Sequence, residues 1–307
     1  MFRLRRRAGN HASIVEEDRV GIRAYVSDHK QSPAGKAALG IGSARHLSPE
    51  CALRAAATIR TGVTSSLARP IDEQDGIVSR DGQPMVGIVP FTMPDGSVDI
   101  LMDRMSIWAH GMVVTHLDAP NHIVIDGEDP ATGDAQQSDQ AWLRWSESGF
   151  VTRGVFFDVP AHRGEDFVTG ERPITRAELE EMEDRLDAPL RPGDALLLYG
   201  GRDVYERTWT GSGPAPLAAA VAHDVAEWVI DRQFSVLCWD VLDSPPTDAF
   251  GVHLLIWADG LAIVDNCDYS PVVETFRSAG RSTAMLSVAP VPIKMSTGCL
   301  VNPIIVF

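Results

Sequence analysis

Short apolar runs alternate with stretches of helical periodicity along most of this chain. Apolar runs of about four to eight residues, bounded by Gly, Pro or Asp, are typical of buried strands. They predict extended segments over residues 63–68, 85–92, 107–114, 154–159, 195–199, 234–239, 261–264 and 284–291. Helical spacing predicts helices over residues 48–61, 175–186 and 217–231, with a shorter helix near His253. Alternating strands and helices, without a long Pro, Gly or Ser linker, predict a single α/β domain.

Two of the predicted helices have clear starts. Ser48 suits the capping position and Pro49 the first helical position, after which the apolar face is expected at Ala52, Leu53, Ala56 and Ile59. Thr175 with Glu178 forms a capping box. The apolar stripe of this second helix is expected at Leu179, Met182 and Leu186.

The first 47 residues have a different texture, with scattered charges, Gly and Ser and no sustained periodicity. We expect residues 1–47 to be an N-terminal extension that is poorly ordered or wraps around another subunit. Residues 48–307 are then expected to form the single folded domain. The basic cluster at residues 3–7 is not followed by an apolar region, so we interpret it as a solvated tail rather than a targeting signal.

Composition narrows the classes of partner. The formal net charge of −15 disfavours nucleic acid and anionic lipid, and no stretch approaches the roughly 18 apolar residues that a membrane helix needs. The cysteines Cys51, Cys238, Cys267 and Cys299 are far apart and lack CxxC spacing, which favours buried reduced thiols. We therefore expect a soluble, cytoplasmic protein whose partner is a small molecule.

Candidate chemistry is concentrated in residues 110–122. This segment holds His110, His116, His122 and Asp118, and imidazole with carboxylate suits Zn²⁺ or Mn²⁺. In an extended strand alternate side chains share a face, so His116 and Asp118 point the same way and His110 can join them. His122 lies just beyond Pro120 and can turn back from a loop. The pattern predicts a metal-dependent hydrolase in which the ion activates water.

The segment Thr115–His122 resembles the T-H-x-D-x-P-x-H core of the cyclase family of metal-dependent hydrolases, which includes bacterial kynurenine formamidase, isatin hydrolase and trans-dienelactone hydrolase. Farther along, His253 and Asp265 resemble the downstream histidine and acidic residue of that family. The ending at residues 297–307 is similar to the family's T-G-S-P-V-N-P-x-A-x-F terminus. The likeness extends from about residue 50 to the end of the chain.

This resemblance implies a swivelling β/β/α-type cyclase fold, in which helices surround a compact barrel-like sheet, and a homodimer or homotetramer. It implies a metal ion, Zn²⁺ or alternatively Mn²⁺, held by His116 and Asp118. His122 corresponds to a histidine placed for proton transfer. His253 and Asp265 would complete the site or hold a second ion.

Two positions depart from the family pattern. Met112 stands where the family has its upstream histidine ligand, and a thioether is a poor ligand for Zn²⁺ or Mn²⁺. Either His110 replaces that ligand through a bulged loop, or the ion has fewer ligands, is a different metal, or is absent. Asp265 replaces a glutamate, so it is either a ligand on a shifted backbone or an outer residue that orients His253.

The function expected from the residues and the resemblance is hydrolysis of an amide, imide or lactone bond in a small, cyclic or aromatic molecule. Metal-activated water would attack the carbonyl, while His122 moves protons to the departing amine or alkoxide. Two alternatives remain. One is a ring-closing cyclase of polyketide-type secondary metabolism, and the other is a non-catalytic descendant that binds a small molecule.

Overall fold

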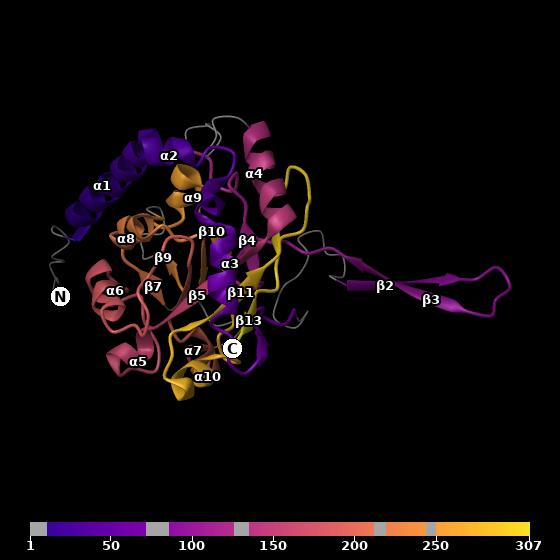
Figure 1. Ribbon diagram of the computed structural model, residues 1–307. Helices are drawn as coiled ribbons and strands as arrows, with labels where there is room; N and C mark the ends of the chain where they lie inside the picture. Colours follow the sequence, from indigo (N-terminus) through magenta and orange to yellow (C-terminus); the bar gives the residue numbers. More distant parts are fainter. Residues whose placement is uncertain (1–10, 72–85, 126–134, 212–218, 244–249) are drawn as a thin grey trace, which may run out of the picture.

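A single large sheet organises the molecule (Figure 1). The computed structural model describes residues 11–71, 86–125, 135–211, 219–243 and 250–307. The helices are α1 (His11–Gln31), α2 (Pro33–Ala37), the 3-10 helix η1 (Gly42–His46), α3 (Pro49–Ala56), α4 (Ala135–Ser148), α5 (Val159–Arg163), α6 (Arg176–Glu183), α7 (Arg202–Thr208), α8 (Val225–Arg232), α9 (Leu254–Asp259) and α10 (Val273–Ala279). The strands are β1 (Thr64–Ser66), β2 (Val86–Thr92), β3 (Asp99–Met105), β4 (His116–Asp118), β5 (Phe150–Asp158), β6 (Ala195–Tyr199), β7 (Ala220–Val221), β8 (Val236–Trp239), β9 (Leu242–Asp243), β10 (Ala262–Asp265), β11 (Thr283–Val288), β12 (Gly298–Leu300) and β13 (Ile304–Val306).

The large sheet has nine strands in the order β1-β13-β11-β5-β6-β8-β10-β4-β12. Its centre, from β5 through β6 and β8 to β10, is parallel, and the strands on both sides of this centre pair antiparallel. The sheet curls strongly, and helices surround it (Figure 1). An α/β fold with a barrel-like sheet and surrounding helices is therefore confirmed.

Both faces of the parallel centre are buried, which explains why its strands are continuous apolar runs. Leu196 and Leu198 of β6 point into one core cluster, which α1, α6, α8 and α9 cover. Leu197 and Tyr199 point into the other core cluster, to which α4 and α10 contribute. The alternation along β6 thus divides the interior into two cores on opposite faces of one sheet.

Most of the predicted elements are present. The run at residues 154–159 lies almost entirely within β5, and the capping box is formed, since the Glu178 N–H donates to Thr175 Oγ1 over 3.3 Å. The helix expected over residues 217–231 begins only at Val225, because Ala220 and Val221 pair with β9 as a short strand. Residues 212–218 lie outside the described part of the chain.

Two expectations were wrong, one about which face of α3 is buried and one about a strand over residues 107–114. In α3, Cys51 and Ala55 are buried and Leu53 is 71% exposed, because the helix lies on β5 with its other side. Residues 107–114 form a loop rather than a strand. Within this loop Gly111 has a φ of +128°, a backbone conformation that favours glycine and interrupts an extended run.

The N-terminal segment is part of the folded body, so the expected poor order was wrong for residues 21–47. Ile22 and Val26 of α1 are spaced four apart and buried, and α1 packs against α9. His29 Nε2 lies 2.6 Å from Asp259 Oδ1 at the end of α9. Among the described side chains of this helix, a buried pair at helical spacing therefore docks it on the core, and Tyr25 packs beside the pair. Wrapping around another subunit stays a prediction.

Strands β2 and β3 form a separate two-stranded hairpin that projects from the body (Figure 1). A turn that includes Asp95 and Gly96 connects them. In the part of the chain that the structure describes, no helix combines the length and apolar character required to cross a membrane.

Candidate metal centre

Strand β4 places two polar side chains on one face of the large sheet. His116 Nε2 lies 3.5 Å from Asp118 Oδ1, whereas Leu117 between them is fully buried in a core cluster. Strand β10 sets Asp265 opposite His116, and strand β12 sets Gly298 opposite Asp118. The expected alternation along residues 116–118 is therefore present, and antiparallel pairing brings a second carboxylate to the same place.

The ring orientation of His116 is fixed by the backbone. Its Nδ1 lies 2.9 Å from the carbonyl oxygen of Val114, which can only accept a hydrogen bond. Nδ1 therefore carries the proton, and the lone pair of Nε2 faces Asp118 Oδ1 and, at 3.8 Å, Asp265 Oδ2. A histidine held in this way is prepared to bind a metal through Nε2.

His110 reaches the same carboxylate from the loop before β4. Its Nδ1 lies 3.0 Å from Asp118 Oδ1, and its Nε2 lies 3.1 Å from the hydroxyl of Thr297. The side chain of Met112 is instead partly exposed, and its carbonyl accepts a hydrogen bond from Arg202. The loop thus brings His110, and not the residue at the family's ligand position, to the centre.

A buried pair of side chains holds this loop in place. Arg202 donates through Nη2 to the Met112 carbonyl at 2.6 Å and through Nη1 to Asn266 Oδ1 at 2.7 Å. Asn266 Nδ2 in turn donates to the carbonyls of Gly111, at 2.7 Å, and Val114, at 3.0 Å. Because three loop carbonyls are bound by two buried side chains, the bulged conformation is specified rather than loose.

Space beside His110 is available only because residue 298 is a glycine. A Cβ atom on Gly298 would lie 2.6 Å from the carbonyl oxygen of Leu117 and 2.6 Å from Cε1 of His110. The first of these atoms belongs to the backbone of β4 and cannot move freely. The glycine therefore permits the approach of His110 to Asp118.

His122 lies on the open side of the centre. Its ring stacks on His110 with 4.0 Å between centroids, and its Nε2 is 3.9 Å from Asp118 Oδ1. Burial lowers the pKa of His122 below its ordinary value, and the neighbouring histidines add to this effect against the opposing charge of Asp118. At neutral pH the imidazole is therefore neutral and can accept a proton.

Asp265 connects the centre to an outer buried pair. Its Oδ2 lies 3.2 Å from His253 Nε2, and its Oδ1 accepts a hydrogen bond from the indole of Trp239. His253 Nδ1 lies 2.6 Å from Asp243 Oδ2. Burial opposes charge on His253, but the carboxylates of Asp265 and Asp243 outweigh it and raise the pKa of His253. His253 thus lies between two carboxylates that favour its protonated form.

The donor set fits a divalent metal ion. There are two groups of candidate ligands, His110 with Asp118 and His122, and His116 with Asp118 and Asp265. Within each group the ligand atoms lie within 4.8 Å of one another. Ligands of one tetrahedral Zn²⁺ are separated by about 3.3 Å, since each lies about 2.0 Å from the ion. In the first group His110 Nδ1 lies 3.0 Å from Asp118 Oδ1, and in the second group His116 Nε2 lies 3.5 Å from Asp118 Oδ1 and 3.8 Å from Asp265 Oδ2, which are separations close to that value. In addition, Asp118 Oδ2 is buried without a hydrogen-bond partner among the described residues.

Of the six candidate site residues predicted from the sequence, five lie together in the candidate metal centre. His110, His116, Asp118, His122 and Asp265 belong to the two ligand groups, whereas His253 touches them only through Asp265. Thr297, Asp243 and Arg202 support the centre as well, although none of them was expected to have a role. Thr297 is the first residue of the C-terminal segment that resembles the family, so the sequence could have identified it. No local sequence pattern marks Asp243 or Arg202.

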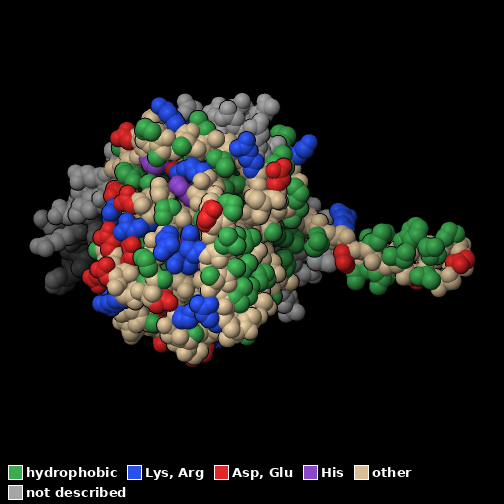
Figure 2. Space-filling model, in the orientation of Figure 1, with side chains coloured by type: hydrophobic (Ala, Val, Ile, Leu, Met, Phe, Trp, Pro, Cys, Tyr) green, Lys and Arg blue, Asp and Glu red, His purple; other side chains and the backbone are tan. Residues whose placement is uncertain are grey.

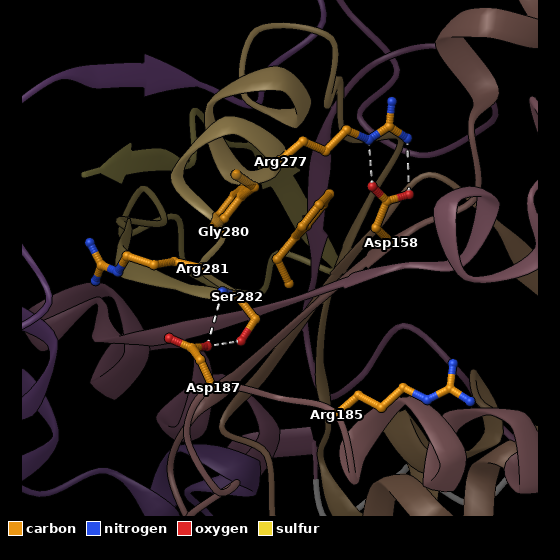
Figure 3. Close-up of a pocket in the computed structure, with 9 residues that line it drawn as sticks. Asp158, Arg185, Asp187, Arg277, Gly280, Arg281 and Ser282 are labelled. Carbon is orange, nitrogen blue, oxygen red and sulfur yellow. Dashed lines mark hydrogen bonds and ion pairs between the residues drawn. The ribbon is translucent and has the colours of Figure 1, made fainter.

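The protein has a further surface pocket that shares no residue with this centre (Figure 3). Its charged side chains have partners: Arg277 Nε donates to Asp158 over 2.7 Å, Asp187 accepts from Ser282, and Arg281 donates to the Thr58 carbonyl. The Arg185 guanidinium lies 3.3 Å from His162 Nδ1. The guanidinium and carboxylate groups that line the pocket thus already have partners, so this pocket is not a second candidate site.

The fold and the histidine-aspartate cluster together indicate the class of protein, an α/β protein with a candidate metal-binding site. The family model named Cyclase matches residues 21–245, so the chain belongs to the Cyclase family. No curated protein matches the chain.

Several solved structures share the fold. A crystal structure described as a novel cyclase has a TM-score of 0.72 and 22% identity, covering 87% of this chain and 96% of that one. Isatin hydrolase A from Ralstonia solanacearum has a TM-score of 0.54 and 16% identity, covering 84% and 97% of the two chains. An isatin hydrolase bound to the product analogue thioisatinate has a TM-score of 0.52 and 13% identity, covering 84% and 98%. The cyclase fold expected from the sequence is thereby confirmed.

Proposed function

We propose that this protein is a metal-dependent hydrolase that cleaves an amide, imide or lactone bond in a small cyclic or aromatic molecule. The observation that carries the proposal is the approach of His110 and His116 to Asp118, with Asp265 facing His116. The second oxygen of Asp118 is buried without a hydrogen-bond partner among the described residues. Membership of the Cyclase family and the isatin hydrolases among the structural neighbours support the same reaction class.

The residues that would hold metal are His116, Asp118 and Asp265 in one group and His110 with Asp118 in the other, with Zn²⁺ the first candidate and Mn²⁺ the second. When bound, such an ion lowers the pKa of water and polarises a carbonyl oxygen. Asp118 belongs to both ligand groups, so one ion or two would share it. In this assignment His253 orients Asp265 from outside.

His122 is the proton-transfer residue in this proposal. Its neutral Nε2 faces the centre, where it takes a proton from the attacking water. As the C–N or C–O bond of the substrate breaks, the same nitrogen returns that proton to the departing nitrogen or oxygen. Water is thus added across the bond, and His122 ends in its starting state.

The test is a hydrolysis assay on protein purified without chelator and loaded with Zn²⁺ or Mn²⁺, using isatin, aryl formamides and simple lactones. Asp118→Asn is expected to lose metal and activity together. His122→Asn is expected to retain metal while turnover falls by about 10²- to 10⁴-fold. His162→Asn, on α5, is the matched control and should behave as wild type.

Two results would contradict the proposal. One is a metal-loaded wild-type protein that hydrolyses no member of the panel, which would favour the ring-closing alternative. The other is full activity in protein whose metal has been removed.

A further inference from the structure

One buried carboxylate lies outside the candidate metal centre. Figure 2 shows acidic and basic side chains spread over this face of the body, where water solvates their charge. Asp240, directly after strand β8, is only 2% exposed. A carboxylate that is removed from water is costly unless hydrogen bonds replace its hydration. The partners of Asp240 therefore indicate what this residue does.

Asp240 holds the start of helix α7. Its Oδ1 accepts a hydrogen bond from the N–H of Gly200 at 2.6 Å, and its Oδ2 accepts one from the N–H of Arg202 at 2.9 Å. Both donors lie at the junction of β6 and α7, and the first N–H groups of a helix have no partner within the helix. The carboxylate thus fixes the main chain on both sides of Gly201.

The first residue of α7 is also the one that supports the loop of the metal centre. The Arg202 guanidinium donates to the Met112 carbonyl at 2.6 Å and to Asn266 Oδ1 at 2.7 Å. The main chain of Arg202 is therefore bound to Asp240, while its side chain is bound to the loop before β4. Asp240, Arg202 and Asn266 are all buried, so water competes little for these hydrogen bonds. A continuous buried network connects Asp240 with the loop that carries His110.

We propose that Asp240 is a positioning residue of the metal centre, which as an anion fixes Arg202 and thereby the loop that brings His110 to Asp118. The hydrogen bonds of Asp240 go to the main chain around the start of α7 rather than to a candidate ligand. Its influence on the metal therefore passes through Arg202. This inference rests on the metal-binding function proposed above.

The charge of Asp240 changes near neutral pH. Burial raises the pKa of Asp240 to about 7, against the opposing effects of its two N–H donors and of the Arg202 guanidinium. Above this pH both oxygens are full acceptors. Below it one oxygen carries a proton and becomes a weaker acceptor for the N–H that it faces. Protonation therefore loosens the start of α7.

The other ionisable groups that face Asp240 come from β6, α7 and the segment after β10. They are Tyr199, Arg202, Asp203, Cys267 and Tyr269. Burial raises the pKa of the thiol and of both phenols above their ordinary values, so these three groups stay neutral at neutral pH. The two charged side chains of α7 form ion pairs with Glu206 and Arg207. The change of charge near pH 7 is therefore assigned to Asp240.

The experiment compares the zinc dissociation constants of wild type and Asp240→Asn between about pH 6 and pH 8. Asparagine keeps the shape of the side chain, but its amide nitrogen cannot accept the second N–H, so the variant resembles protonated wild type. We expect the variant to bind zinc about 10- to 100-fold more weakly at the upper end of this range. The ratio of the two constants is expected to fall about 5- to 10-fold at the lower end, where wild type is mostly protonated. Both proteins contain the same histidines, so proton competition at the ligands cancels in this ratio.

Asp194→Asn is the matched control. Asp194 is fully buried, but it binds Arg153 and the N–H of Arg191 before β6. Strands β6 and β8 are parallel, so Asp194 and Asp240 lie at opposite ends of the sheet. The control variant is expected to be less stable than wild type, while its folded form binds zinc with unchanged affinity throughout the pH range.

A double-mutant cycle tests whether the effect passes through Arg202. In the Arg202→Lys background, Asp240→Asn is expected to weaken zinc binding by less than about 3-fold, because residues of one network are not additive. Circular dichroism confirms that each variant is folded before titration. If Asp240→Asn does not fold, Asp240→Ser takes its place with the same expectations, since serine keeps one acceptor and adds no bulk.

Three results would overturn the inference. The first is equal zinc affinity in wild type and Asp240→Asn, and the second is a loss that does not change with pH, as a purely structural role would give. The third is the same loss in the presence and in the absence of Arg202. These results leave the metal centre itself intact. A wild type that binds no zinc at any pH would instead contradict the metal centre, and this inference with it.

Discussion

At the scale of single residues, Asp118 is the group on which the centre depends. Its Oδ1 is approached by His110 at 3.0 Å and by His116 at 3.5 Å, and its Oδ2 has no partner among the described residues. A buried carboxylate oxygen left without a hydrogen bond is costly, and a bound cation would remove that cost. The unpaired oxygen of Asp118 therefore indicates that the site binds a cation.

Gly298 offers a test at this scale. Gly298→Ala places a methyl group 2.6 Å from the Leu117 carbonyl and from His110, so β12 or His110 must move. We expect a loss of about 1–3 kcal/mol in the free energy of unfolding, as for other overpacked sites, together with weaker metal binding. Urea denaturation and zinc titration measure the two effects. Gly164→Ala is the control for alanine in place of a glycine with positive φ, because a Cβ there meets no atom within 4 Å. Unchanged zinc affinity in Gly298→Ala would show that His110 is not a ligand.

At the scale of elements, the sequence predicts the strands of the centre better than the loop before them. The alternation at residues 116–118 is sufficient to place His116 and Asp118 together, because β4 is an ordinary strand. Residues 107–114 also read as extended, but the hydrogen bonds of Arg202 and Asn266 hold them as a loop. These partners are distant in sequence, so no local pattern identifies them.

Arg202→Lys tests the role of this support. Lysine keeps the charge but loses the planar fork that binds Met112 and Asn266 together. We expect zinc affinity to fall about 10- to 100-fold, as for other residues that orient ligands, while the protein remains folded. Isothermal titration calorimetry gives the affinity, and circular dichroism reports the fold. Arg207→Lys on the same helix is the matched control, because Arg207 is 63% exposed and pairs with Asp203 of α7 rather than with the loop. Equal affinities in the two variants would exclude a positioning role for Arg202.

At the scale of the whole molecule, the N-terminal helix closes one core of the sheet. The amino-acid pattern before residue 48 is too polar to predict docking. Among the side chains of α1 that the structure describes, Ile22 and Val26 are buried in that core and Tyr25 packs against it. His29 also contacts Asp259, and the Lys30 ammonium lies over the Trp257 ring. Local hydrophobic periodicity does not predict contacts between segments that are distant in the sequence.

Val26→Asp therefore destabilises the whole molecule rather than a tail. The substitution puts a charge at a fully buried position against α9, and we expect a loss of about 3 kcal/mol in the free energy of unfolding. Ala24→Asp is the matched control, because residue 24 is exposed on the same helix. Thermal unfolding distinguishes the two. Equal melting temperatures would mean that α1 is not docked in solution.

The central claim is that His110, His116, Asp118 and Asp265 bind a divalent metal ion. The most direct measurement is a zinc titration of chelator-treated protein, followed by elemental analysis, for wild type and for Asp118→Asn. Asp118→Asn removes the charge of the one residue that belongs to both ligand groups and keeps its shape. We predict one or two tightly bound Zn²⁺ per chain in wild type and none in the variant. Equal zinc content in both proteins, or none in wild type, would contradict the account.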